Sequence, residues 1–178
     1  DGGIVGNPPG ASVPTRFFVS GSGAEEMNIF DGKGVDIKQC GPEAGKASAI
    51  KMCYAGITKG TSALHAAMLM AAEKLGIADD LHDELTYSQG AMYKRMEVLT
   101  SALPAVSDRY IGEMEEIAKT MSAIGMPSGF HDGSADLYGL MTKSPYASEI
   151  RETVDKNRTM RQTIEGCAVV VGNKAAAE

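Results

Sequence analysis

Residues 41–60 read GPEAGKASAIKMCYAGITKG and open the longest helical pattern in the chain. Pro42 and Glu43 supply the fixed backbone angle and the negative charge that suit a first helical turn, and no further proline interrupts the pattern. Gly76 is a typical stop signal. The pattern therefore predicts one long helix over about residues 43–75.

Helical patterns continue beyond this segment. In YIGEMEEIAKTMSAIG (110–125), apolar residues recur at steps of three or four, so one helix face is apolar and the other is acidic. Further helices are expected from ADDLHDEL (78–85) onward, and then over about residues 88–103, 107–124, 128–143 and 147–166. Together these segments predict a helical bundle.

The first forty residues have a different texture. Short apolar, β-prone runs at 4–5, 17–19 and 35–37 are separated by Gly-, Pro- and Ser-rich turns, and AEEMNIF (24–30) is typical of one short helix. Two or three such strands leave edges that need pairing or cover. The expected fold class is therefore mainly α, a helical bundle with a long crossover helix preceded by two or three short strands.

Composition restricts the function classes. The chain has 178 residues, of which 43% are hydrophobic, enough for one domain with a core or one domain plus a fragment. Its net charge of -6 argues against a nucleic-acid partner. The longest uncharged apolar run, residues 60–72, is too short to span a membrane. Three widely spaced cysteines suggest neither a disulfide framework nor a zinc site, so a reducing, cytoplasmic location is expected.

Lys51 is the candidate catalytic residue of the long helix. At 100° per residue, Tyr54, Ala55 and Thr58 lie within roughly 60° of it on one helix face. Small and apolar neighbours would partly desolvate the amine and lower its pKa, which suits a general acid or base. The alternative is that Lys51 lays its alkyl stem over the core and extends its ammonium into water. Spacing alone leaves both interpretations open.

Other motifs give less support to an active site. GSG at 21–23 follows a strand, but Glu26 occupies the place of the third glycine of a dinucleotide fingerprint. The three histidines lack metal-ligand spacing, so no metal site is expected. Ser20 has no obvious His or Asp partner and lies outside a GxSxG motif. Gly56 and Gly60 form a GxxxG pair, which predicts close packing by another helix or chain.

Family resemblance adds what these patterns leave open. The order DGGIVGNPPG, FFVSGSGAEE and VDIKQCGPEAGKASAIKMCYAGITKG, followed by an all-helical remainder, resembles the β-hydroxyacid dehydrogenase and 6-phosphogluconate dehydrogenase superfamily. More narrowly, it resembles the branch whose C-terminal domain was long catalogued as a domain of unknown function similar to 6-phosphogluconate dehydrogenase.

The resemblance implies a set of site residues. A Rossmann domain holds NAD(P) in that superfamily, and a lysine on the crossover helix performs acid/base chemistry; Lys51 occupies its place. Gly6, Asn7 and Ser48 would lie near the substrate. A later cofactor-contacting lysine of the family is missing, and Arg109 is the nearest cation to its position.

The sequence also departs from its relatives. Gly3 and Val5 replace the usual proline and serine of the substrate loop. Tyr54 and Ala55 stand where 6-phosphogluconate dehydrogenase has histidine and asparagine, and Thr58 stands where it has glutamate. Decarboxylation by that enzyme's mechanism is therefore not expected.

The resemblance further implies the organisation of the whole protein. Residues 1–42 would be the terminal strands of a Rossmann-type domain, 43–75 the interdomain helix, 76–172 the helical substrate and dimerisation domain, and 173–178 a frayed tail. The family's nucleotide fingerprint lies upstream of DGGIVG. The chain is therefore expected to lack the nucleotide-binding half and to be inactive alone.

The expected activity is that of an NAD(P)-dependent oxidoreductase, NADP being preferred to NAD, which acts on a small hydroxy acid or its carbonyl counterpart as a homodimer. Two alternatives remain. One is a non-catalytic helical assembly domain; the other is an imine or carbonyl reductase of the same superfamily, in which Tyr54 would become the proton donor.

Overall fold

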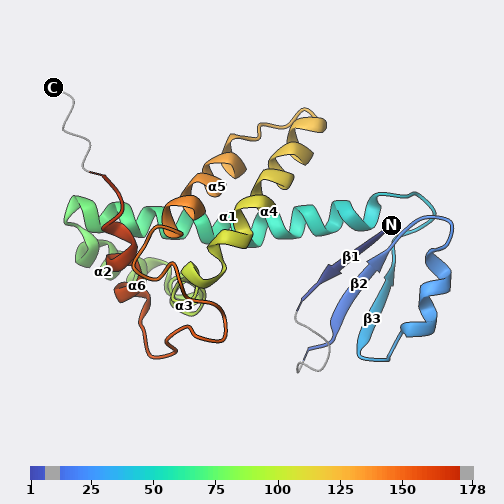
Figure 1. The fold of residues 1–178 in the computed structure, drawn as a ribbon, viewed down its shortest axis with the longest axis horizontal. Helices are drawn as coiled ribbons and strands as arrows, with labels where there is room; N and C mark the ends of the chain where they lie inside the picture. The colour runs from blue at the N-terminus through green and yellow to red at the C-terminus, as the bar shows by residue number, and fades with distance from the viewer. Residues whose placement is uncertain (7–12, 173–178) are drawn as a thin grey trace. The chain divides into compact units, whose positions relative to one another are not determined.

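The long helix joins two compact units. The computed structural model describes residues 1–6 and 13–172 and divides the chain into Asp1–Ile57 and Thr58–Glu178. Helix α1 (Lys46–Leu75) has 30 residues and contributes to both units (Figure 1). Within the described residues, no helix combines the length and apolar character needed to cross a membrane.

The first unit contains a three-stranded sheet in the order β1-β2-β3 (Figure 1). β1 pairs with β2 antiparallel and β2 pairs with β3 parallel, while the side chains of Val19, Ala24 and Ile37 form a small core. The elements are β1 (Gly2–Val5), β2 (Thr15–Val19), the 3₁₀ helix η1 (Ala24–Phe30) and β3 (Val35–Gln39). The strands and the short helix expected from the sequence are thereby confirmed.

Helix α1 begins at Lys46, three residues later than the predicted start at about residue 43. Gly45 has φ of +97°, a left-handed conformation that a helix cannot continue through. The proline-based start signal at Pro42 is therefore wrong in detail, because the chain makes a turn before it enters the helix.

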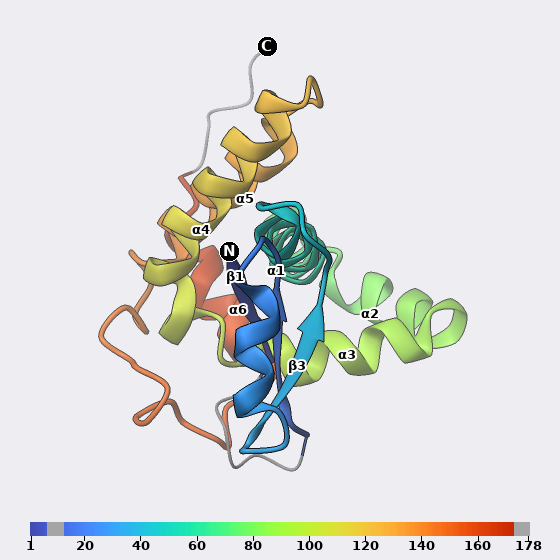
Figure 2. The ribbon, with the colours of Figure 1, turned by 90° about the vertical axis from the view of Figure 1, so that its right-hand side faces the viewer.

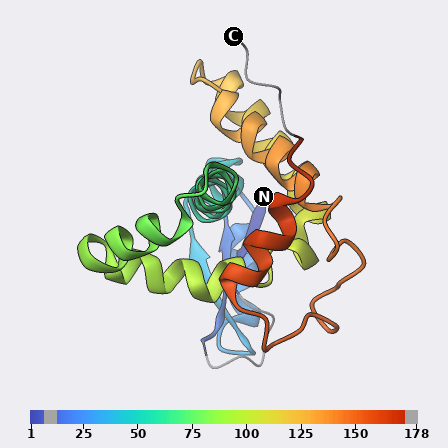
Figure 3. The ribbon, with the colours of Figure 1, turned by 90° about the vertical axis from the view of Figure 1, so that its left-hand side faces the viewer.

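The second unit is helical and confirms the mainly α fold class. Helices α4 and α5 lie side by side as a hairpin (Figure 2), and α6 packs against α3 (Figure 3). Met70, Met114 and Tyr138 are among its largest fully buried side chains. The helices after α1 are α2 (Ala78–Ser88), α3 (Gly90–Thr100), α4 (Pro104–Ala123), α5 (Gly129–Met141) and α6 (Met160–Ala168).

The predicted helix over residues 147–166 is wrong in its first half, because the regular helix begins only at Met160. Side chains bind backbone groups in the preceding segment: Ile150 N–H donates to Thr153 Oγ1 at 2.9 Å, and Asn157 N–H donates to an Asp155 carboxylate oxygen at 2.9 Å. Such local bonds compete with helical ones. The helix starts where Thr159 and Gln162 cap each other.

Small residues on α1 allow helix α5 to approach closely. Gly60 is buried, and a Cβ atom there would lie 3.1 Å from a ring carbon of Phe130. The Tyr138 hydroxyl donates to the Lys59 carbonyl oxygen at 2.7 Å, and the Lys59 ammonium pairs with Glu113 of α4. Close helix packing at Gly60, expected from the GxxxG pattern, is thereby confirmed.

A half-buried histidine on α1 gives the fold a pH dependence. Burial is the main cause that holds the pKa of His65 below its ordinary value, and the charge of Arg95 adds to it. Because the unfolded chain then binds the proton more readily, the free energy of unfolding should decrease as pH falls below about 6.5. Urea titrations at several pH values should show this decrease, and His65→Gln should make it smaller. An unchanged slope in the variant would contradict this origin.

Candidate active site

Asp1 caps the start of helix α1. Its carboxylate accepts hydrogen bonds from the N–H groups of Gly45 and Ser48, each at 3.1 Å, and from the Ser48 hydroxyl at 2.5 Å. The Ser20 hydroxyl donates to the same carboxylate at 2.9 Å and accepts from the Ala47 N–H at 3.1 Å. These bonds satisfy N–H groups that a helix start leaves without partners. The network thus fixes the first turn of α1 beside the start of β1.

Gly3 sets the distance between β1 and α1. A Cβ atom on Gly3 would lie 2.7 Å from the Ala47 carbonyl oxygen and 3.2 Å from Lys51 Cβ. The helix therefore packs directly on the backbone of the strand, and Lys51 leaves the helix at this contact. The missing side chain of Gly3 permits this close approach.

The Lys51 side chain is exposed in the described structure. Of its immediate neighbours, Ala47 is fully buried, whereas Ile50 is exposed. The partial desolvation expected from the small and apolar sequence around Lys51 is therefore not found. Lys51 is thus accessible to a bound molecule.

The other predicted catalytic residues lie on the same helix. Tyr54 belongs to the first unit and is 52% exposed, and Thr58 is half-buried and begins the second unit. Both have hydroxyl groups, so both can donate and accept hydrogen bonds. Within the described ranges, no group of three or more His, Cys, Asp or Glu side chains is arranged to hold a metal ion. The chemistry available on this helix face is thus that of one amine and two hydroxyls.

The predicted substrate- and cofactor-binding residues differ in how accessible the structure leaves them. Gly6 lies at the end of β1 with φ of +109° and is exposed, whereas Asn7 lies outside the described residues. Ser48 is next to the helix start, but its hydroxyl already donates to Asp1. Arg109, the cofactor-contacting candidate, pairs with Glu113 at 2.9 Å on α4.

The GSG turn at 21–23 is unsuited to a dinucleotide. The GSG turn at 21–23 follows β2 but leads into the 3₁₀ helix η1, whose first turn carries Glu25 and Glu26. Two carboxylates at this place would repel a pyrophosphate, which a dinucleotide fold binds at the start of an α-helix. A nicotinamide cofactor would have to be held mainly by other residues.

Sequence reasoning missed the role of Asp1 and Ser20. Their partners on α1 lie between 27 and 47 residues away, so no local spacing indicates the network. Ser20, which seemed from its surroundings in the sequence to lack an acidic partner, does have one in Asp1. The available signal was an aspartate beside a glycine pair at the start of a strand.

Substituting Gly3 should disturb the site. In Gly3→Ala, the new methyl group would collide with a backbone carbonyl, so the unfolding free energy should fall by about 1–3 kcal/mol. Gly23→Ala is the matched control, because its Cβ would meet no atom within 4 Å and its φ is -96°. Urea unfolding of both variants measures the difference. Equal stability of the two proteins would contradict the close contact.

Part of the helical region matches a known protein family. Residues 72–141, from the last turn of α1 to the end of α5, match the family described as a domain of unknown function, DUF1932. This stretch of the chain is similar to that family. This confirms the branch of the superfamily that the sequence resembles.

One curated relative and two solved structures extend the comparison. An uncharacterized 28.5 kDa protein in the 7S RNA 5′ region of Methanothermus fervidus is 31% identical over 78 residues, which are 44% of this chain and 31% of that protein. The conserved protein MTH1747, of unknown function and reported to be structurally similar to 3-hydroxyacid dehydrogenases, is 29% identical with a TM-score of 0.65. That match covers 80% of this chain and 55% of the other.

A conserved hypothetical protein from Sinorhizobium meliloti 1021 shares the fold of this chain. The TM-score is 0.71 at 20% identity, over 96% of this chain and 56% of the other. The chain thus spans between about a third and just over half of the length of these three proteins.

Proposed function

We propose that this chain is the C-terminal part of an NAD(P)-dependent oxidoreductase that acts on a small hydroxy acid or its carbonyl counterpart. The observation that carries the proposal is Lys51, which leaves α1 directly over the glycine strand β1, with its amine accessible. The reported likeness of MTH1747 to 3-hydroxyacid dehydrogenases supports the same reaction class.

Lys51 would act as the acid or base. In the oxidation direction its neutral amine accepts the proton of the substrate hydroxyl, and in the reduction direction its ammonium donates a proton to the carbonyl oxygen. Either transfer needs an N–O distance of about 2.6–3.2 Å. Bound substrate and the remainder of the protein would remove water from this exposed side chain, which favours the neutral amine.

The other residues would position the substrate. Tyr54 would orient the substrate or the Lys51 amine through its hydroxyl, and Thr58 would provide a neutral hydrogen bond. Gly6 and Asn7 would approach the substrate from the end of β1. Ser48 would act chiefly through its bond to Asp1, by holding the start of the helix.

The nicotinamide cofactor would supply or accept the hydride, and NADP is proposed over NAD. It would be bound mainly by a nucleotide-binding domain outside this chain, because the GSG turn at 21–23 is unsuited to it. Arg109, if it contacts the cofactor, would first have to exchange its bond to Glu113. A cytoplasmic location fits a soluble cofactor of this type.

A homodimer through the helical domain is part of the proposal. Leu64, Met68 and Leu75 recur along α1 at steps of four and seven, and 45%, 54% and 72% of these residues are exposed. Residues at this spacing share one helix face, and burial of such a face is a common basis for helix association. The same face supports the rival function, a non-catalytic assembly domain.

Assays of the longer protein distinguish these functions. With NADP⁺ or NAD⁺ and a series of small 2- and 3-hydroxy acids, the oxidoreductase should reduce the cofactor, and this chain alone should not. Reduction of a cyclic imine instead would favour the imine reductase alternative. A dimer without turnover of any hydroxy acid, carbonyl or imine would leave the assembly domain as the function.

A further inference from the structure

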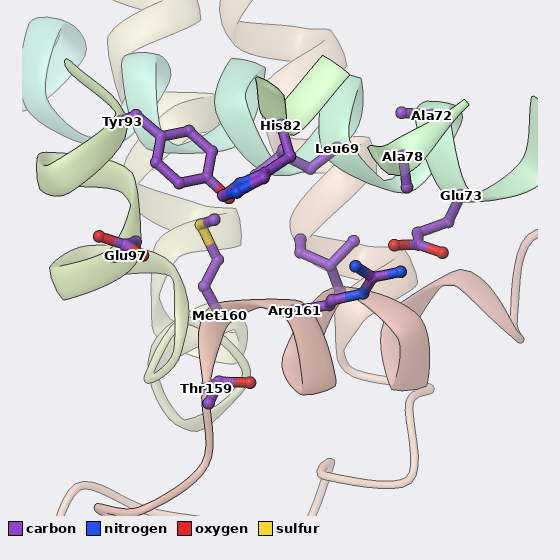
Figure 4. Close-up of a pocket in the computed structure, with 11 residues that line it drawn as sticks. Leu69, Ala72, Glu73, Ala78, His82, Tyr93, Glu97, Thr159, Met160 and Arg161 are labelled. Carbon is purple, nitrogen blue, oxygen red and sulfur yellow. The ribbon is translucent and has the colours of Figure 1, made fainter. Parts of the chain in front are cut away.

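The helical unit contains a second candidate site, which is a pocket. A pocket of about 310 Å³ lies between the end of α1, the α2–α3 hairpin and the start of α6 (Figure 4). Its apolar wall comes from Leu69, Ala72, Ala78, Met160 and Ile164. This volume and this largely apolar lining are typical of pockets that bind small organic molecules. All the lining residues belong to Thr58–Glu178, and none of them is part of the proposed Lys51 chemistry.

An oriented tyrosine forms one side of the pocket. The Tyr93 hydroxyl and His82 Nδ1 share a hydrogen bond of 2.8 Å, and their rings meet edge to face with centroids 5.0 Å apart. Burial is the main cause that raises the pKa of Tyr93, with a smaller effect from Glu97, so the phenol is neutral at physiological pH. The pocket therefore presents a fixed, uncharged aromatic ring.

The positive groups at the pocket already have partners. Arg161 donates to an Asp79 carboxylate at 2.5 Å and to a Glu165 carboxylate at 3.0 Å. At the start of α6, the Gln162 N–H donates to the Thr159 hydroxyl, and the Thr159 N–H donates to the Gln162 side chain. Few donors are left for an anion.

The pocket lining also carries two carboxylates. Glu73 and Glu97 face the pocket from α1 and α3 (Figure 4). In the part of the chain that the structure describes, neither carboxylate forms a hydrogen bond or an ion pair. The charge of Glu73 acts on the Arg161 guanidinium and helps to raise the pKa of that group. Glu97, which lies close enough to Tyr93 to raise the pKa of its phenol, is therefore the carboxylate that gives the apolar cavity a negative potential, and such an environment attracts cations.

We propose that this pocket binds a small organic ammonium ion with an apolar body. The ammonium group would lie near Glu97, within reach of the Tyr93 ring, and the apolar body would contact Leu69 and Met160. A carboxylate that receives a charged hydrogen bond stabilises a complex more than a neutral one does. The site thus selects for charge at one end and for apolar volume at the other.

Three probes of equal size test the charge selectivity on the full chain. Benzylammonium, benzyl alcohol and benzoate are titrated separately while the methyl signals of Leu69, Met160 and Ile164 are followed by NMR. Benzylammonium should shift these signals with an affinity about tenfold or more above that of benzyl alcohol, and benzoate should bind least. Equal affinities, tighter binding of benzoate, or no response to benzylammonium at any soluble concentration would overturn the proposal.

Matched variants locate the site. Glu97→Gln should weaken benzylammonium binding by about three- to tenfold, because it removes the charged acceptor, and Glu73→Gln should weaken it less, because Glu73 faces Arg161. Glu115→Gln makes the same charge change on the exposed face of α4 and should leave binding unaltered. Ala78→Leu should weaken the binding of benzylammonium and benzyl alcohol alike, because it fills the cavity. Equal effects of the Glu97 and Glu115 variants would overturn the assignment to this pocket.

Discussion

Lys51→Ala should lower the turnover of the proposed oxidoreductase by about 10²–10⁴-fold, the range expected when a positioned acid or base is removed. Folding should be preserved, because the Lys51 side chain is exposed and its removal leaves the contact between Gly3 and the Ala47 carbonyl intact. Steady-state rates with saturating cofactor and hydroxy acid, together with circular dichroism of the variant, provide the measurement.

Two variants separate proton transfer from charge. Lys51→Arg keeps the positive charge, but a guanidinium does not release a proton near neutral pH, so its turnover should stay close to that of the alanine variant. Lys46→Ala removes another exposed lysine of the same helix, one that pairs with Glu43 at 3.0 Å, and should retain turnover. Full activity of Lys51→Ala would remove this residue from the reaction.

Arg158→Met should lower the free energy of unfolding by about 3–5 kcal/mol, the range for breaking one partner of a buried ion pair. The Arg158 guanidinium binds both carboxylate oxygens of Glu149, at 2.5 and 2.6 Å, and donates to the Ser101 carbonyl oxygen at 3.1 Å. It also lies 3.9 Å from the centre of the Tyr146 ring. The variant would leave the half-buried Glu149 carboxylate without its main partner, and urea unfolding measures the loss.

Arg161→Met is the matched control for this prediction. Arg161 also pairs with two carboxylates, Asp79 and Glu165, but its side chain is 56% exposed against 6% for Arg158. Exposed ion pairs contribute about 1 kcal/mol or less. A similar loss of unfolding free energy in the two variants would mean that burial does not determine how much the Arg158–Glu149 pair stabilises the protein. If Arg158→Met does not fold, the milder Glu149→Gln should still show a larger loss than the control.

Most of the fold could be predicted from local sequence patterns. Strand and helix patterns predicted the short strands, the long helix and the two helices that correspond to α4 and α5, because apolar spacing reflects which face is buried. The segment before Met160 could not be predicted in this way. Its helical composition is outweighed by bonds from the Thr153 and Asp155 side chains to the backbone, which periodicity does not register.

The candidate site was predictable only in part. Helical spacing placed Lys51, Tyr54 and Thr58 together, and family resemblance gave the lysine its proposed role. The network around Asp1 joins residues from two ends of the first unit, so it depends on tertiary structure. The exposure of Lys51 also depends on tertiary contacts. The small and apolar residues around it in the sequence predicted partial desolvation, which the structure does not show.

The contact at Gly3 also limits how the proposed oxidoreductase could be redesigned. The atom nearest to a new side chain would be the Ala47 carbonyl oxygen, which belongs to the backbone. No exchange of side chains on α1 can make room for it. Specificity of the proposed oxidoreductase could therefore be altered by varying Tyr54 and Thr58 along the helix, whereas a side chain at position 3 of this chain would displace α1 and with it Lys51.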